Sequence, residues 1–137
     1  MANDTVILSP ECVGKNRREG IALEAIITGA FISAGVGGFE LTTAGEARQY
    51  LAIENIATAQ DEEYVYSIDE NVFATIPTMG CRVKVKALAE VYAEGATIQI
   101  GAGGLVSNVV AGTVIGVVPI GAGATVTAGG SLIIDLL

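Results

Sequence analysis

The sequence contains no histidine and no tryptophan, and only 5% of its 137 residues are aromatic. Without histidine, the usual Ser-His and Cys-His pairs of nucleophilic catalysis cannot form. Zinc sites that combine cysteine with histidine are excluded for the same reason. Carbohydrate sites usually need aromatic platforms, which are scarce here. We therefore expect a protein that is not an enzyme and that has no catalytic residues, no metal site and no cofactor.

Cysteine is also scarce, with Cys12 and Cys81 far apart in the chain and no CxxC spacing. A disulfide between them stays open, and two buried thiols are the favoured interpretation. The first twenty residues lack the basic segment and long apolar stretch of a signal peptide.

Positive charge is in short supply, with 7 basic against 15 acidic residues and a formal net charge of −8. Such a chain repels nucleic acid and anionic membrane surfaces unless its basic residues are concentrated. The one basic cluster, Lys15, Arg17 and Arg18, is diluted by Glu11 and Glu19. We expect it to lie in a solvated loop, and we expect no nucleic-acid partner.

The acidic run at Asp61, Glu62 and Glu63 has oxygen ligands that a divalent cation could use. Its spacing does not match that of an EF-hand loop, so we expect a solvated acidic loop instead.

Charge is nearly absent from the C-terminal part, where Asp135 is the only charged residue between Gly95 and Leu137. Its glycines, Pro119 and many β-branched residues argue against a membrane-spanning helix. So much apolar sequence is hard to bury within one small chain. We therefore expect this part to pack against another chain, and we expect no membrane association.

Short apolar runs alternate with glycine turns along most of the sequence, and the run "RVKVKALA" places Arg82, Lys84 and Lys86 on one face of a strand. That basic face should be wet or meet acids across a neighbouring strand. We count roughly eight to ten strands at a spacing of about 8–12 residues, which is typical of sandwiches and small barrels. The prediction is an all-β fold: a small antiparallel β-barrel or sandwich with short hairpins. An extended arm over residues 1–19 precedes the domain at 20–137.

The stretch "IQIGAGGLVSNVVAG" (98–112) resembles a phosphate-binding loop at first sight. The dinucleotide fingerprint needs a glycine at the sixth position and a helix behind it. Val106 occupies that position, and strand-like residues follow. The stretch is therefore predicted to be a β-hairpin that turns through Gly-Ala-Gly-Gly.

From about residue 20 to the end, the order of turns and strands resembles the capsid cement (decoration) proteins of tailed bacteriophages. An A-x-E-N segment follows a glycine hairpin, and an acidic linker follows that segment. A strand then leads to V-x-x-G-x-x-I-x-x-G-x-G-x-L and to I-G-V. The matching residues are Ala52, Glu54, Asn55, Val91, Gly95, Ile98, Gly101, Gly103, Leu105, Ile115, Gly116 and Val117. The first twenty residues match nothing in that pattern, and Glu94, Gly95 and Ala102 replace turns that commonly contain aspartate.

The resemblance implies a structural protein of the virion, made in the host cytoplasm and bound to the capsid exterior. It would bridge subunits of the major capsid protein and stabilise the shell, as a homo-oligomer with a trimer favoured. Candidate capsid or oligomer contacts lie in the arm, where "VILSP" could add a strand to a partner's sheet; they are Val6, Ile7, Leu8, Lys15, Arg17 and Arg18. The alternatives are a head–tail connector or tail module and, less favoured, a small β-sandwich that binds ligands or carbohydrate.

Overall fold

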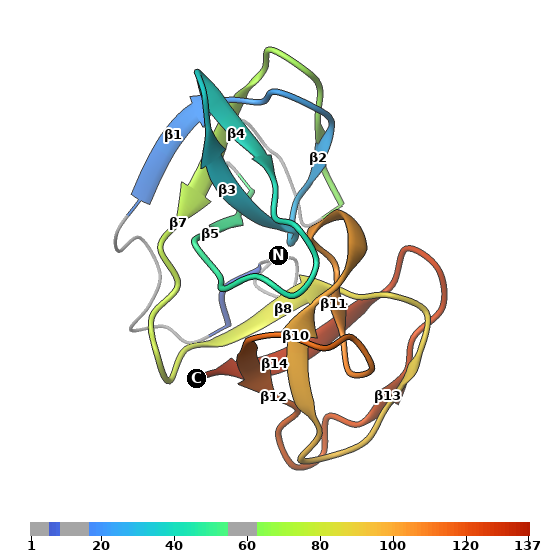
Figure 1. The fold of residues 1–137 in the computed structure, drawn as a ribbon. Coiled ribbons are helices and arrows are strands. Elements are labelled where there is room, and N and C mark those ends of the chain that lie inside the picture. The colour runs from blue at the N-terminus through green and yellow to red at the C-terminus, as the bar shows by residue number, and fades with distance from the viewer. Residues whose placement is uncertain (1–5, 9–16, 55–62) are drawn as a thin grey trace.

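A computed structural model of the chain describes residues 6–8, 17–54 and 63–137. Almost every regular element in these residues is a β-strand (Figure 1). The strands are β1 (Arg17–Ile21), β2 (Ile26–Ile27), β3 (Phe31–Gly35), β4 (Gly38–Leu41), β5 (Tyr50–Ala52), β6 (Val65–Tyr66), β7 (Asn71–Thr75), β8 (Arg82–Lys86), β9 (Val91–Tyr92), β10 (Thr97–Ile100), β11 (Val106–Ser107), β12 (Val114–Val117), β13 (Ala124–Thr125) and β14 (Ser131–Leu136).

These strands form two five-stranded antiparallel sheets and two short ribbons. The first sheet has the order β1-β7-β5-β3-β4, and the second has the order β11-β10-β12-β14-β8. The ribbons pair β9 with β13 and β2 with β6. In Figure 1 the first sheet occupies the upper half of the view and the second sheet the lower half. The predicted all-β antiparallel class is confirmed, as sandwich-like sheets rather than a closed barrel. The strands of the described residues outnumber the predicted eight to ten because several are only two residues long.

Strands β8 and β14 form the longest regular pair of the second sheet and show why alternation predicted it. Val83 lies opposite Ile134 and Val85 opposite Leu132, and all four side chains are buried. On the other face of the pair, Arg82 lies opposite Asp135. Alternate side chains of a strand point to opposite faces, so one face fills the core while the other meets solvent and acids.

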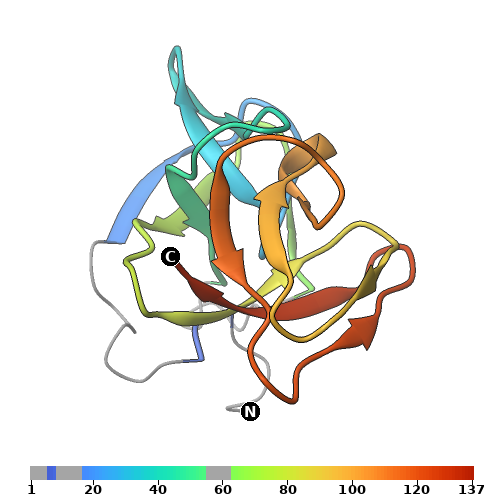
Figure 2. The same cartoon turned by 60° about the horizontal axis from the view of Figure 1, so that its bottom comes forward.

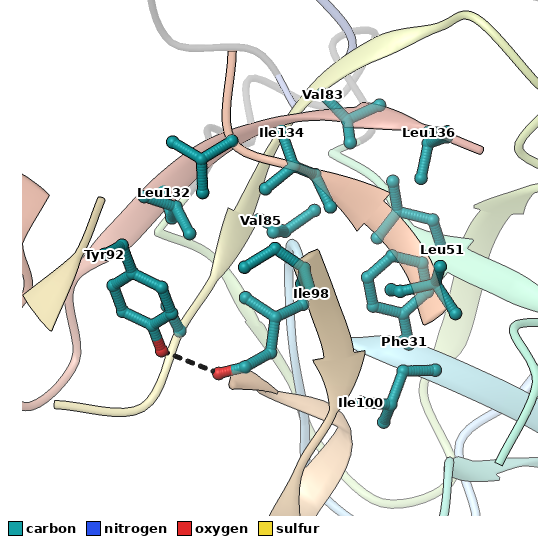
Figure 3. Close-up of a cluster of buried hydrophobic side chains, with 14 of the residues drawn as sticks. Phe31, Leu51, Val83, Val85, Tyr92, Ile98, Ile100, Leu132, Ile134 and Leu136 are labelled. Carbon is teal, nitrogen blue, oxygen red and sulfur yellow. Dashed lines mark hydrogen bonds between the residues drawn. The ribbon is translucent and has the colours of Figure 1, made fainter. Parts of the chain in front are cut away.

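The described residues bury two separate clusters of apolar side chains. The larger, which we call the main core, lies between the sheets (Figure 3). The second sheet supplies most of it, with Phe31 of β3 and Leu51 of β5 reaching it from the first sheet. The other cluster, which we call the small core, belongs to the N-terminal half and consists of Ala22, Ile26, Ile32, Phe39, Ala52, Tyr66, Val72 and Ala74.

Backbone contacts join the two sheets at several points. The Lys86 amide donates to the Gly29 carbonyl (3.0 Å), and the Gly45 amide donates to the Ile100 carbonyl (2.7 Å). A Cβ atom added at Gly104 would lie 2.3 Å from the Phe31 carbonyl oxygen. Such close approach is possible only without a side chain, so glycine at this position allows the β10–β11 loop to lie directly on β3.

The Gly-Ala-Gly-Gly stretch turns between β10 and β11, which pair as Gln99 with Ser107 and Ile100 with Val106. The turn includes a short 3-10 segment at Ala102–Gly104. The predicted hairpin is therefore confirmed, although its second strand covers only Val106–Ser107 of the expected "LVSNVV".

Candidate interaction surface

Three of the predicted contact residues, Val6, Ile7 and Leu8, lie along the outer edge of β8. The Lys84 amide donates to the Val6 carbonyl (2.7 Å), and the Leu8 amide donates to the Arg82 carbonyl (2.9 Å). Ile7 and Val83 form an antiparallel bridge. The segment that was expected to add a strand to a partner's sheet thus extends the second sheet of its own chain.

Both the side chain and the backbone amide of Val6 hold it in this position. Its side chain is buried in the main core, so it is not accessible to a partner. Its backbone amide donates to both carboxylate oxygens of Glu54, each at 3.3 Å. Glu54 is only 8% exposed. Glu54 belongs to the A-x-E-N segment, and no local pattern in the sequence indicates its link to Val6, because the two residues lie 48 positions apart.

Arg17 and Arg18 lie on β1 and are exposed. The Arg17 guanidinium carbon lies 4.4 Å from the centroid of the Phe73 ring, and Arg18 donates to the Arg17 carbonyl (2.9 Å). Strand β1 crosses the expected boundary between arm and domain at residues 19 and 20 and pairs with β7 along its whole length. Lys15 lies outside the described residues. The two arginines therefore present positive charge at the edge of the first sheet.

The basic face of β8 meets acids, as one of the two predictions for it required. The Arg82 guanidinium binds Asp135 across the strand pair, at 2.8 and 3.1 Å, and this contact raises the pKa of Arg82. The Lys86 ammonium donates to Glu63 at 2.8 Å. The Lys86 side chain is only 4% exposed, so this face is not uniformly wet.

Glu63 is the one residue of the predicted acidic run that falls within the described part, and it serves as the partner of Lys86. Asp61 and Glu62 lie outside that part. Among residues 6–8, 17–54 and 63–137, no group of three or more His, Cys, Asp or Glu side chains is placed to hold a metal ion.

A serine and a carboxylate come together at the start of the loop after β11. Ser107 donates to Glu90 (2.7 Å), whose other oxygen accepts from the Asn108 amide (2.9 Å). Ser107 also accepts from the Val109 amide (3.1 Å) and is fully buried. A nucleophile must reach its substrate, so this pair fixes the loop rather than forming a catalytic site.

Cys81 is disulfide-bonded, so the favoured expectation of two buried thiols is wrong. The sequence holds one other cysteine, Cys12, which lies outside the described residues. In the part of the chain that the structure describes, no helix is long and apolar enough to cross a membrane.

In comparisons with known proteins, no family model matches the chain, and no curated protein matches it in sequence.

Proposed function

We propose that this protein is a capsid decoration protein that binds the outside of a tailed-phage shell and bridges subunits of the major capsid protein. The observation that carries the proposal is the ordered set of turn and strand residues by which the chain resembles that family. These turn and strand residues resemble those of the cement proteins, so they favour a decoration protein over a connector or tail module.

The residues that carry the resemblance are buried, hydrogen-bonded or closely packed in the structure. This is expected if the shared pattern maintains the fold. Ala52 is buried in β5, and Gly95 donates its amide to the Val118 carbonyl (2.8 Å) in the turn before β10. Gly116 of β12 lies opposite Leu136 of β14, where an added Cβ atom would be 2.9 Å from the Asp135 carbonyl oxygen. A protein whose distinguishing residues maintain a scaffold suits a structural role.

Charge supports the same role. A net charge of −8 disfavours binding to the polyanions of a lysed cell. Exposed Arg17 and Arg18 on β1 place two positive charges, beside exposed Glu19, at one edge of this acidic protein. We propose that β1 contacts an acidic part of the capsid surface, whereas Val6 anchors the arm within its own chain.

Adding the purified protein to phage shells that lack their decoration protein tests the proposal. Binding at many copies per shell and a higher melting temperature of the shell support it. Shells that neither bind the protein nor gain stability contradict it. A few copies per particle, measured by quantitative mass spectrometry, would favour a connector.

A pair of charge-changing variants tests the contact on β1. Arg18→Glu should weaken shell binding, because it places an acid against an acidic partner. Glu46→Lys is the control for charge alone: it changes the charge by two units in the opposite sense at an exposed loop position, so it should not weaken shell binding. Equal effects of both variants on shell binding would contradict a contact at β1.

A further inference from the structure

Two different segments of the chain cover the outer edge of β8. At the start of the strand, residues 6–8 accept from the Lys84 amide (2.7 Å) and donate to the Arg82 carbonyl (2.9 Å). At its end, the Lys86 amide donates to the Gly29 carbonyl (3.0 Å) in the turn between β2 and β3. In Figures 1 and 2 the short blue segment of residues 6–8 lies beside β8. The first half of this edge is thus covered by the arm, and the second half by the N-terminal sheet region.

A disulfide begins at the residue that directly precedes β8. Cys81 is disulfide-bonded within this single chain. The sequence holds one other cysteine, Cys12, which leaves it as the partner. Cys12 lies outside the described residues, so its part in the bond follows from this count alone. The bond therefore joins the arm to the strand whose edge the arm covers.

This bond shortens the tether of residues 6–8. Leu8 lies four positions before Cys12 and nine positions before Arg17, where β1 begins. Without the bond, the nearest described anchor of the arm is therefore β1, which pairs with β7 in the first sheet. The equilibrium constant for closing a flexible loop falls as the 3/2 power of its length, so the shorter tether favours docking of the arm by about threefold.

The Cys81 sulfur has a hydrogen-bond partner whether or not the disulfide is present. It lies 3.0 Å from Thr78 Oγ1, and the Cys81 amide donates to the Thr78 carbonyl (3.2 Å). Cys81 is only 4% exposed and belongs to the main core. The Thr78 hydroxyl can donate to the disulfide sulfur or accept the S–H of a reduced thiol. Reduction therefore leaves no unpaired polar group at the start of β8, and the strand can keep its place.

We propose that the disulfide at Cys81 is a redox latch, which holds residues 6–8 on β8 when it is closed and lets them leave more often when it is reduced. A dithiol supplies the electrons. One of its thiolates attacks the disulfide to form a mixed disulfide, and the other then closes the dithiol's own disulfide. The dithiol loses two electrons and two protons, which the sulfurs of Cys81 and Cys12 gain as two thiols.

Release of the arm uncovers the Lys84 N–H and the Arg82 carbonyl. Unpaired groups of this kind are what a further strand pairs with when it adds to a sheet. Gly29 still covers the Lys86 end of β8, so the opening is limited to the start of the strand. Cytosolic thiols keep disulfides reduced, whereas disulfides persist outside the cell. The edge is thus more accessible in reducing surroundings, and this latch does not depend on capsid binding.

Peptide mapping of the oxidised chain, digested without reductant, tests the pairing. The expected result is a fragment in which Cys12 and Cys81 are linked, and which dithiothreitol separates into two thiols that can be alkylated. Free thiols in the oxidised protein, or a disulfide between two copies of the chain, would overturn the latch.

Hydrogen exchange of single backbone amides, measured by NMR with and without dithiothreitol, tests the hold on the arm. The Lys84 amide should exchange through local release of residues 6–8, at a rate that low urea leaves unchanged, and reduction should raise this rate about threefold or more. The Lys86 amide is the matched control on the same edge, because its acceptor is Gly29. It should exchange only when the sheets unfold, at a rate that rises with urea in both redox states.

Cys12→Ser removes the bond but keeps Cys81 and its contact with Thr78. Its Lys84 amide should exchange as in the reduced protein, with or without dithiothreitol, which excludes an effect of the reductant itself. Circular dichroism establishes that the variant is folded; if it is not, the reduced unaltered protein decides the question. Equal Lys84 rates in the oxidised and reduced protein, or a Lys84 rate that depends on urea as the Lys86 rate does, would overturn the proposal.

Discussion

The main core and the small core exclude water with different side chains. The main core contains seventeen buried residues of the described part, and fifteen of them are not aromatic. The small core contains eight, among them Phe39 and Tyr66, with Tyr50, Tyr64 and Phe73 packed against its border. Phe39 and Tyr50 meet edge to face with their centroids 5.2 Å apart, and Tyr64 and Tyr66 do so at 5.1 Å.

The strands that supply the two cores also differ. The alternating strand β14 sends Leu132, Ile134 and Leu136 into the main core, which is therefore filled by aliphatic side chains. The β2–β6 ribbon has two residues in each strand, so it supplies few side chains to the small core. An aromatic ring buries more area per residue than an aliphatic side chain does. The rings of Phe39 and Tyr66 thus add buried area to a cluster of only eight side chains.

The largest expected effect comes from separating the two sheets at Gly104. A Cβ atom there would lie 2.3 Å from the Phe31 carbonyl oxygen, and the residue has φ of +74°. Gly104→Ala must therefore move the β10–β11 loop off β3, and it should lower the free energy of unfolding by about 3 kcal/mol or more. Denaturant unfolding of the purified protein measures this change.

Gly103→Ala is the matched control, because Gly103 also has positive φ (+69°) but nothing within 4 Å of an added Cβ atom. It should cost only about 1–2 kcal/mol, which is the usual cost of a left-handed conformation for alanine. Equal losses in the two variants would show that the contact between the sheets contributes nothing.

The second expected effect concerns the ion pair that joins Lys86 of β8 to Glu63 of the N-terminal half. The ammonium is nearly buried, whereas the carboxylate is largely exposed. Glu63→Gln leaves a buried charge without its carboxylate, so we expect a loss of about 1–2 kcal/mol, moderated by the exposure of Glu63. Lys86→Met keeps an apolar stem of similar length and removes the charge.

Thermal unfolding of the two variants should therefore show a larger loss for Glu63→Gln than for Lys86→Met. The opposite order would mean that the charge of Lys86 is well solvated in the folded protein. Glu46→Gln is a control for removing one exposed acid.

Periodicity made the aliphatic part of the fold predictable. The alternation of Arg82, Val83, Lys84 and Val85 identified β8, and the glycines around 101–104 identified the turn between β10 and β11. Both signals are local, since they depend on residues within a few positions of one another. The pairing within the short ribbons was not predicted, because two paired residues carry too little pattern to specify a partner or a register.

The contacts that hold the candidate surface depend on distant parts of the chain. Val6 meets Glu54 because residues 6–8 lie along β8, and no local pattern indicates which sheet edge they cover. Arg82 meets Asp135 across the strand pair, as one expectation required, whereas nearly buried Lys86 meets Glu63, which lies on no neighbouring strand of the sheet.

The smallest expected effect compares the fully buried tyrosines, one in each core. Burial raises the pKa of both Tyr66 and Tyr92, and in Tyr92 the nearby Glu90 carboxylate adds to the shift. Because the folded pKa lies above the unfolded value of about 10, this contribution to stability is complete below that pH and is lost as pH rises above it.

Near neutral pH each hydroxyl stabilises the fold through hydrogen bonds: Tyr66 donates to the Ile53 carbonyl (2.6 Å), and Tyr92 lies 2.9 and 3.0 Å from the carbonyls of Leu88 and Val106. Tyr66→Phe and Tyr92→Phe should therefore each cost about 1 kcal/mol at neutral pH. The cost should shrink at alkaline pH, where phenylalanine has no proton to lose. Denaturant unfolding at about pH 7 and about pH 11 measures both values, with Tyr50→Phe as a control whose hydroxyl bonds to no described residue. A cost that is the same at both pH values would mean that these tyrosines do not couple ionisation to folding in either core.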